Sequence, residues 1–188
     1  MAAATIAENA AGVLITLGTS STDDATIIST RNNTVVANKV HTAICRITLE
    51  DVDKDGLYFG FWTAADVEIR SAEPTNGVWF ESGSTVATLI GTVRTATGTS
   101  ADTGTLATLV DDTFVELGVQ FSCGATAATS WGHWWVNGTR TVFTAAQLTA
   151  LGVAGAAADA VLCAGIGSNT NDAADVVTIA YAWAGVDR

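Results

Sequence analysis

The stretch SWGHWWVNGTR, residues 130–140, concentrates aromatic and cationic side chains next to an Asn-Gly pair. Asn-Gly between two apolar runs predicts a two-residue type I′ hairpin. Pairing across this turn places four side chains on one face: Trp131, His133, Trp135 and Arg140. Indole rings offer flat apolar surfaces on which a sugar ring can stack, while the histidine and arginine can donate hydrogen bonds. These four residues are therefore the candidate ligand-binding site; the alternatives are a half-buried face of the core and a contact between subunits.

A second stretch, DVDKDG at 51–56, begins like a calcium-binding loop, with Asp51, Asp53 and Asp55 at alternate positions and a glycine sixth. The position that should supply the bidentate glutamate is Trp62, so the ligand set is incomplete. A solvated acidic turn between two strands is the alternative. We expect no metal site.

The stretch ADVEIRSAE, residues 65–73, contains Asp66, Glu68 and Glu73. Sandwich glycanases need two carboxylates on one strand face, and Asp66 and Glu68 have that spacing. Arg70 follows on the same face, where it would neutralise a carboxylate rather than raise its pKa. The sequence therefore predicts no catalytic residue and no enzyme activity.

Nucleophilic chemistry also finds little support in the chain. There is no Gly-x-Ser-x-Gly elbow, and His41, at the start of a strand-like run, is expected on the surface. Three cysteines, Cys45, Cys123 and Cys163, lie among apolar or small residues, which predicts buried thiols in a reducing compartment. No cysteine spacing suggests zinc, and no cofactor is expected.

The elements that must position these residues are strands. The chain has 188 residues, a single proline, and many β-branched residues in about a dozen short apolar runs separated by glycine-rich or polar connectors. In TFVELGVQF, alternate residues are apolar, as in a strand with one buried face: Val115, Leu117, Val119 and Phe121. This pattern predicts an all-β fold, a two-sheet antiparallel β-sandwich of the jelly-roll type.

One short connecting helix is expected at 144–152. Thr144 and Gln147 have the spacing of a capping box, and Gly152 is a helix-ending residue. We further expect a flexible N-terminal arm at 1–12, a single sandwich domain at 13–188, and a loop at 95–105.

The net charge of −11 argues against binding to nucleic acid or to an anionic membrane surface. The N-terminus lacks the pattern of a secretion signal, and no apolar run approaches the ~20 residues of a membrane span. A cytoplasmic site of synthesis is the expectation.

The order of LYFGFWT, TNGVWFE, DDTFVELGVQF and WWVNGTR resembles concanavalin A-like, laminin-G-like jelly rolls over about residues 35–185. In these proteins a strand ending in an aromatic-Val-Asn-Gly hairpin is common. The Ala/Thr/Gly-rich, lysine-poor composition is most similar to jelly rolls found among virion proteins of tailed bacteriophages.

This resemblance implies a non-catalytic capsid decoration (cement) protein. Such a protein assembles in the host cytoplasm, binds the major capsid protein or other virion proteins at the capsid surface, and forms a homo-oligomer such as a trimer. The alternative is a carbohydrate-binding, lectin-like module or a receptor-binding virion component, which would use the face of Trp131 and Trp135.

Overall fold

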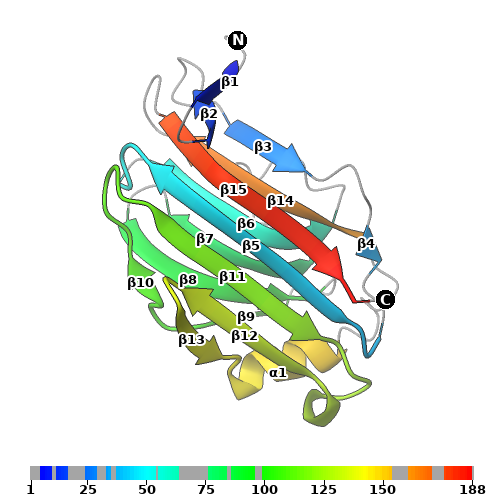
Figure 1. The fold of residues 1–188 in the computed structure, drawn as a ribbon. Coiled ribbons are helices and arrows are strands. Elements are labelled where there is room, and N and C mark those ends of the chain that lie inside the picture. The colour runs from blue at the N-terminus through cyan, green and yellow to red at the C-terminus, as the bar shows by residue number, and fades with distance from the viewer. Residues whose placement is uncertain are drawn as a thin grey trace.

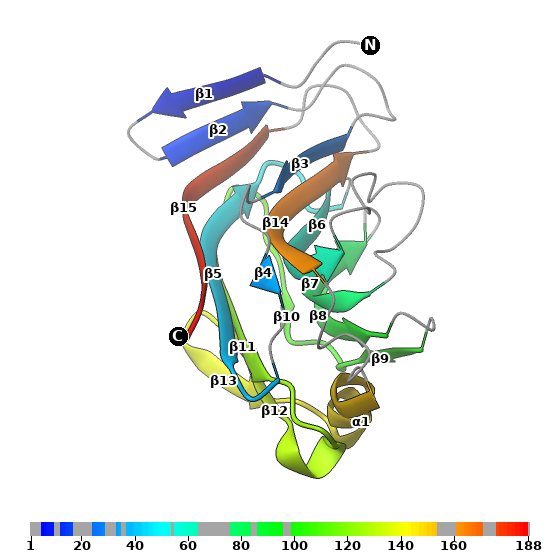
Figure 2. The ribbon, with the colours of Figure 1, turned by 90° about the vertical axis from the view of Figure 1, so that its right-hand side faces the viewer.

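Two antiparallel β-sheets face each other in the computed structural model of the chain, and this confirms the predicted β-sandwich (Figures 1 and 2). The structure describes residues 5–9, 12–16, 24–28, 33–34, 37–53, 55–63, 76–83, 86–95, 99–153, 161–170 and 176–187.

We call the two layers sheet A and sheet B. Sheet A has seven strands, in the order β1 (Thr5–Asn9), β2 (Gly12–Thr16), β15 (Val176–Val186), β5 (Val40–Leu49), β11 (Val115–Ser122), β12 (Trp131–Val136) and β13 (Thr139–Val142). Sheet B has eight strands, in the order β10 (Ala107–Thr108), β8 (Val86–Arg94), β7 (Gly77–Gly83), β6 (Asp55–Thr63), β14 (Val161–Thr170) and β3 (Asp24–Ile28), with β4 (Asn33–Thr34) beside β14 and β9 (Ser100–Asp102) beside β8.

The β12–β13 hairpin has the predicted register, with Trp135 opposite Arg140 and His133 opposite Val142. Asn137 and Gly138 have φ of 49° and 79°, as a type I′ turn requires at both central residues. This local turn decides which side chains of β12 face solvent.

The core lies between the sheets. The alternation in β11 is confirmed, because all four of its predicted apolar residues are buried: Val115, Leu117, Val119 and Phe121. Trp134, which is fully buried, meets Phe80 of sheet B edge-on at 4.8 Å and stacks on Phe143 at 4.7 Å between ring centroids. Aromatic packing therefore joins the two sheets.

The expectation that His41 lies on the surface is wrong. Its ring is fully buried, stacks on Phe121 at 5.2 Å and meets Phe61 of sheet B edge-on at 6.2 Å. The alternation of β5 points this side chain into the core, and the rings that cover it come from strands distant in sequence.

Helix α1 (Ala145–Val153) confirms the predicted helix, although it continues one residue beyond Gly152. The capping box forms: the backbone N–H of Gln147 donates to Thr144 Oγ1 at 3.2 Å, and the backbone N–H of Thr144 donates to Gln147 Oε1 at 3.0 Å. Leu151 is buried in the core, so the helix closes one end of the sandwich next to β8 and β9. A single turn of 3₁₀ helix (Ala127–Thr129) lies beside it.

The loop expected at 95–105 contains strand β9, so this expectation is wrong in part. Asp102 accepts hydrogen bonds from the hydroxyls of Thr92 and Ser100, at 3.0 and 2.9 Å. The bond from Thr92 joins β9 to β8, and the bond from Ser100 lies within β9. Within the segment expected as a flexible arm, β1 pairs with β2; the solution behaviour of residues 1–12 stays a prediction.

The outer face of sheet B carries two fully buried indoles, Trp62 and Trp79. Each lies opposite a glycine of the neighbouring strand, Gly77 and Gly60 respectively, whose φ values are +152° and +150°. The strand LYFGFWT therefore has buried side chains on both faces, although Tyr58 on the outer face is half-buried.

The thiols of Cys45 and Cys123 are free and buried, as predicted. Burial raises the pKa of Cys123 to about 12 and also raises that of Cys45, so both remain protonated at neutral pH. In the part of the chain that the structure describes, neither helical segment is long and apolar enough to cross a membrane.

Candidate functional site

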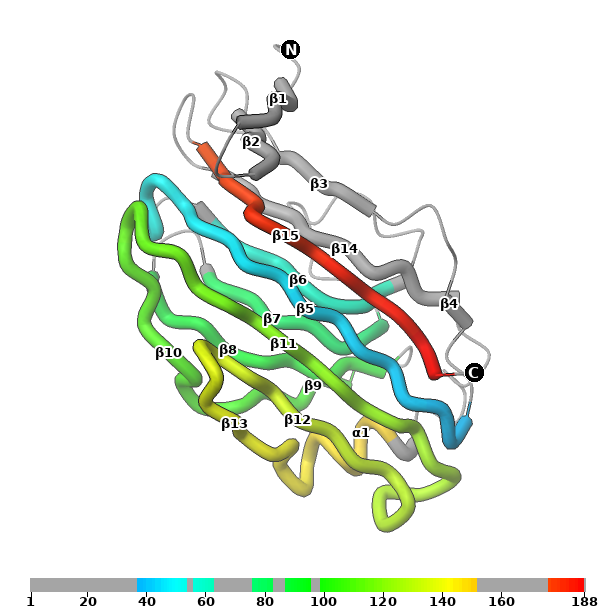
Figure 3. The backbone as a smooth tube through the Cα atoms, viewed as in Figure 1, coloured from blue at the N-terminus to red at the C-terminus, as the bar shows by residue number. Residues whose placement is uncertain are grey.

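The outer face of sheet A carries a row of side chains that crosses five strands. The register aligns Arg140 (β13), Trp135 (β12), Gly118 (β11), Ile44 (β5) and Trp183 (β15). In these strands the neighbours of Trp135 and Ile44 along the chain are buried, so both side chains point outward. Trp183 is 58% exposed, and its indole lies over Gly185. Strand β11 runs through the middle of this face (Figure 3).

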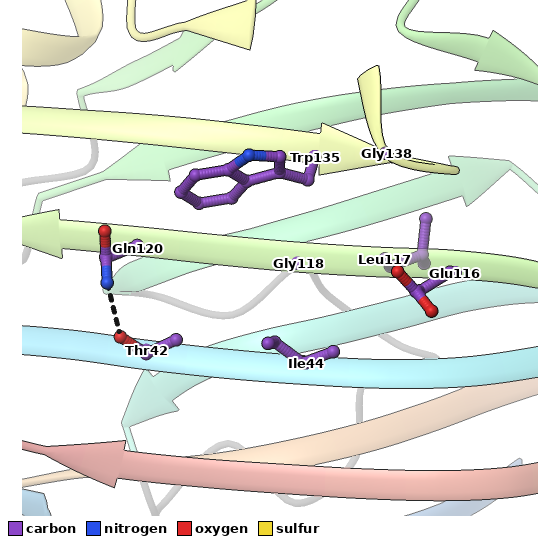
Figure 4. Close-up of a pocket in the computed structure, with 8 residues that line it drawn as sticks. All are labelled: Thr42, Ile44, Glu116, Leu117, Gly118, Gln120, Trp135 and Gly138. Atoms are coloured by element: carbon purple, nitrogen blue, oxygen red, sulfur yellow. Dashed lines mark hydrogen bonds between the residues drawn. The ribbon is translucent and has the colours of Figure 1, made fainter. Parts of the chain in front are cut away.

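A shallow groove of about 300 Å³ lies at the centre of this face (Figure 4). Gly118 forms its floor, with Trp135 on one side and Ile44 on the other, because glycine leaves a gap in the row. A Cβ atom at Gly118 would lie 3.6 Å from both the Trp135 Cβ and the Ile44 Cγ1 atoms, which is ordinary contact. The groove is lined by Thr42, Ile44, Glu116, Leu117, Gly118, Gln120, Trp135 and Gly138.

Polar side chains line both ends of the groove. At one end, Gln120 Nε2 donates to Thr42 Oγ1 at 3.1 Å, which leaves the Gln120 amide oxygen as an acceptor (Figure 4). At the other end, the Glu116 carboxylate accepts a hydrogen bond from the hydroxyl of Tyr181, and this bond raises the pKa of Tyr181. The groove therefore combines an apolar middle with hydrogen-bonding groups at its ends.

Beside the groove, the rings of β12 form a continuous ladder. The centroid of the His133 ring lies 5.4 Å from that of Trp131 and 5.5 Å from that of Trp135. Arg140 Nη2 is 2.6 Å from His133 Nε2. Because guanidinium can only donate, Nε2 is the acceptor and the neutral imidazole carries its proton on Nδ1. The structure thus brings together all four residues predicted from the sequence.

Burial, and then the charge of Arg140, lower the pKa of His133 below its usual value near 6.5. The unfolded chain therefore binds more protons than the folded chain between the lowered pKa and 6.5. We expect stability to fall as the pH drops below 6.5 and to level off once the pH passes below the folded-state pKa.

This pH dependence is measured by urea unfolding of the wild type and of His133→Gln between pH 7.5 and 5. The wild type should lose more stability than the variant, since the titration of all other groups is common to both proteins. Parallel curves for the two proteins would contradict the expectation.

The sequence reasoning missed Tyr181 and Trp183, which extend the aromatic face across β15. Strict alternation would place both with Val177 and Ile179, which are buried. A β-bulge between Ile179 and Tyr181 shifts the register, so that Tyr181 lies opposite Arg46 and Trp183 opposite Ile44 on the outer face. The signal for this face was therefore hidden by one extra residue.

The other sequence candidates lie elsewhere. The backbone N–H of Asp53 donates to Asp51 Oδ1 at 3.1 Å, an arrangement typical of a tight turn. The side chain of Asp55 and the whole of residues 65–73, with Asp66, Glu68, Arg70 and Glu73, lie outside the described residues. Among the side chains that are described, no three acidic, histidine or cysteine residues cluster as metal ligands would.

Solved structures with this architecture define the class of the fold. The chain is similar to an alginate lyase from Pseudomonas aeruginosa (TM-score 0.66, 11% identity, covering 97% of this chain and 86% of that one). It is also similar to the potassium-bound carbohydrate recognition domain of Emp46p (TM-score 0.61, 9% identity, 96% and 85%) and to the carbohydrate-binding module CBM66 from Bacillus subtilis (TM-score 0.50, 10% identity, 94% and 88%). The chain thus has a jelly-roll fold of the concanavalin A-like kind. No protein-family model and no curated protein sequence matches it.

Proposed function

We propose that this chain is a lectin-like, carbohydrate-binding protein that holds a glycan on the outer face of sheet A. The observation that carries the proposal is the distribution of its six tryptophans. Three are fully buried, and the other three are solvent-accessible on this one face. Trp135 lines the groove, and Trp131 and Trp183 lie on the same face outside its lining.

The chemistry of a sugar ring explains why such a face suits it. A pyranose has apolar C–H faces that stack on indole rings and equatorial hydroxyls that need hydrogen-bond partners. In the groove, Trp135 provides a stacking surface, and the Gln120 amide and Glu116 carboxylate provide hydrogen-bond partners for the hydroxyls. The likeness of the fold to carbohydrate-binding domains adds support.

The proposed function is binding without catalysis. Glycoside hydrolysis needs a pair of carboxyl groups, one on each side of the scissile bond. Glu116 is the one carboxylate among the residues that line the groove, and it accepts the hydrogen bond of Tyr181.

The capsid-decoration role, with its capsid partner, oligomeric state and virion location, stays a prediction from the sequence. The solved structures named above are carbohydrate-binding domains and a lyase, and they give the virion role no support.

Trp135→Ala should weaken glycan binding at least tenfold, because it removes the stacking surface beside Gly118. A tenfold loss corresponds to about 1.4 kcal/mol, within the range expected for one aromatic contact. The ligand is first identified on a glycan array, and affinities are then measured by isothermal titration calorimetry.

The matched control is Val110→Ala, which truncates a side chain that is 60% exposed and does not line the groove. Both variants should melt close to the wild type, since neither residue is in the core. The proposal would be contradicted if Trp135→Ala bound the glycan as tightly as the wild type, or if the wild type gave no signal on the glycan array.

A further inference from the structure

We infer that the glycan held by this groove is a neutral, linear chain that lies lengthwise along β11. This inference rests on the proposed function and names its ligand class.

The length of the groove indicates a chain of several sugars. Its lining runs along β11 from Glu116 to Gln120, four residues apart, which is about 14 Å at the rise of an antiparallel strand. That distance exceeds a single sugar ring. The ring ladder on β12, ending at Trp135, runs parallel to the groove, whereas Trp183 does not line it.

The charges around the groove disfavour an acidic polymer. Among the lining residues Glu116 is the charged one, so a uronate would meet a carboxylate. Neither nearby cation lines the groove: Arg46 lies opposite Glu116 in the register with its guanidinium 4.8 Å above the Phe114 ring, and Arg140 contacts His133. The net charge of −11 repels a polyanion over longer distances.

Neutral sugars fit the same groups. Their hydroxyls can donate to the Glu116 carboxylate and to the Gln120 amide oxygen, which are acceptors at opposite ends of the groove. A chain that spans both ends satisfies both acceptors, and a monosaccharide can reach only one of them.

Gly118 sets the width of the groove. Its φ lies outside the left-handed region and a Cβ would make ordinary contacts, so a side chain is tolerated by the fold. Gly118→Val places two methyl groups where the glycan would lie, while Gly118→Ala adds a single methyl group at the floor.

Affinity electrophoresis of the folded chain tests the ligand class. The gels contain neutral polymers (hydroxyethyl cellulose, xylan, glucomannan, laminarin) or acidic ones (alginate, polygalacturonate). Oligosaccharides of two to six units from the most strongly retarding polymer are then titrated calorimetrically into the wild type, Gly118→Ala, Gly118→Val and Trp183→Ala.

We expect retardation by a neutral polymer and none by the acidic polymers. Affinity should increase at least tenfold from two units to the length that fills the groove. The affinity for this oligosaccharide should fall at least tenfold in Gly118→Val and by a smaller factor in Gly118→Ala. In Trp183→Ala it should fall less than threefold. Circular dichroism and melting curves verify that each variant is folded.

Retardation by alginate or polygalacturonate that is lost in Trp135→Ala would overturn this inference and leave the proposed function standing. Affinity that does not change with chain length, or a Trp183→Ala loss as large as that of Gly118→Val, would likewise overturn it. Failure of every polymer to retard the wild type would overturn both this inference and the proposed function.

Discussion

Trp134→Ala is expected to lower the free energy of unfolding by about 3 to 5 kcal/mol, the range measured when a buried tryptophan or phenylalanine is truncated to alanine. The side chain is fully buried and contacts the rings of Phe80 and Phe143. A Cβ atom at Gly91 would lie 2.6 Å from its Cε2 atom, so the indole lies directly against the backbone of sheet B.

The cost should be near the upper end of that range. Phe80 belongs to β7 of sheet B and Phe143 to the connection between β13 and α1, and strands held by backbone ladders cannot collapse into the cavity that alanine leaves. Loss of the indole also removes the hydrogen bond from Trp134 Nε1 to Gln147 Oε1, at 3.4 Å.

Urea unfolding followed by far-ultraviolet circular dichroism measures the effect. Trp183→Ala is the matched control, because it removes the same indole from an exposed site and should change stability by no more than about 0.5 kcal/mol. If Trp134→Ala cost less than 1 kcal/mol, the described packing between the sheets would be wrong.

Gln147→Leu is expected to cost about 2 to 4 kcal/mol, although the substitution makes the core more apolar. Gln147 is fully buried, and its Nε2 donates to the carbonyl oxygen of Gly91 at 2.8 Å while its Oε1 accepts from Thr144 N. Leucine has a similar volume but removes the acceptor of the buried Trp134 Nε1–H and of the Thr144 N–H, and it leaves the Gly91 carbonyl oxygen with the Thr103 N–H at 2.9 Å alone. An unsatisfied buried group costs about 1 to 3 kcal/mol, and loss of the helix cap adds to that cost.

The same unfolding experiment applies, with Thr149→Ala as the control on the same helix. Thr149 is exposed, and its hydroxyl donates to the Ala145 carbonyl oxygen at 2.8 Å. Removal of this exposed hydroxyl should leave the free energy of unfolding nearly unchanged. A Gln147→Leu protein as stable as the wild type would show that α1 docks on β8 without the hydrogen bond from Gln147 to the Gly91 carbonyl oxygen.

The features that the sequence predicts well are local. The turn at Asn137 and Gly138 and the capping pair of Thr144 and Gln147 depend on residues a few positions apart, so their chemistry can be recognised along the chain. The face of Trp131, His133, Trp135 and Arg140 follows from the turn alone.

The features that the sequence could not predict depend on pairing across long distances. His41 is buried because Phe61 and Phe121 meet it from two sheets. The groove exists because β5 and β12 flank Gly118, which no local pattern encodes. Trp183 reaches the outer face through a bulge that breaks the alternation on which strand prediction depends.

The division of the tryptophans between the core and one face also has an optical consequence. Acrylamide, a neutral quencher that acts from the water, should extinguish emission from the indoles on the outer face of sheet A and spare that of Trp62, Trp79 and Trp134. The quenchable light then reports whether the face is occupied, and the protected, blue-shifted light reports whether the interior is intact. A single unlabelled sample can therefore follow both events at once.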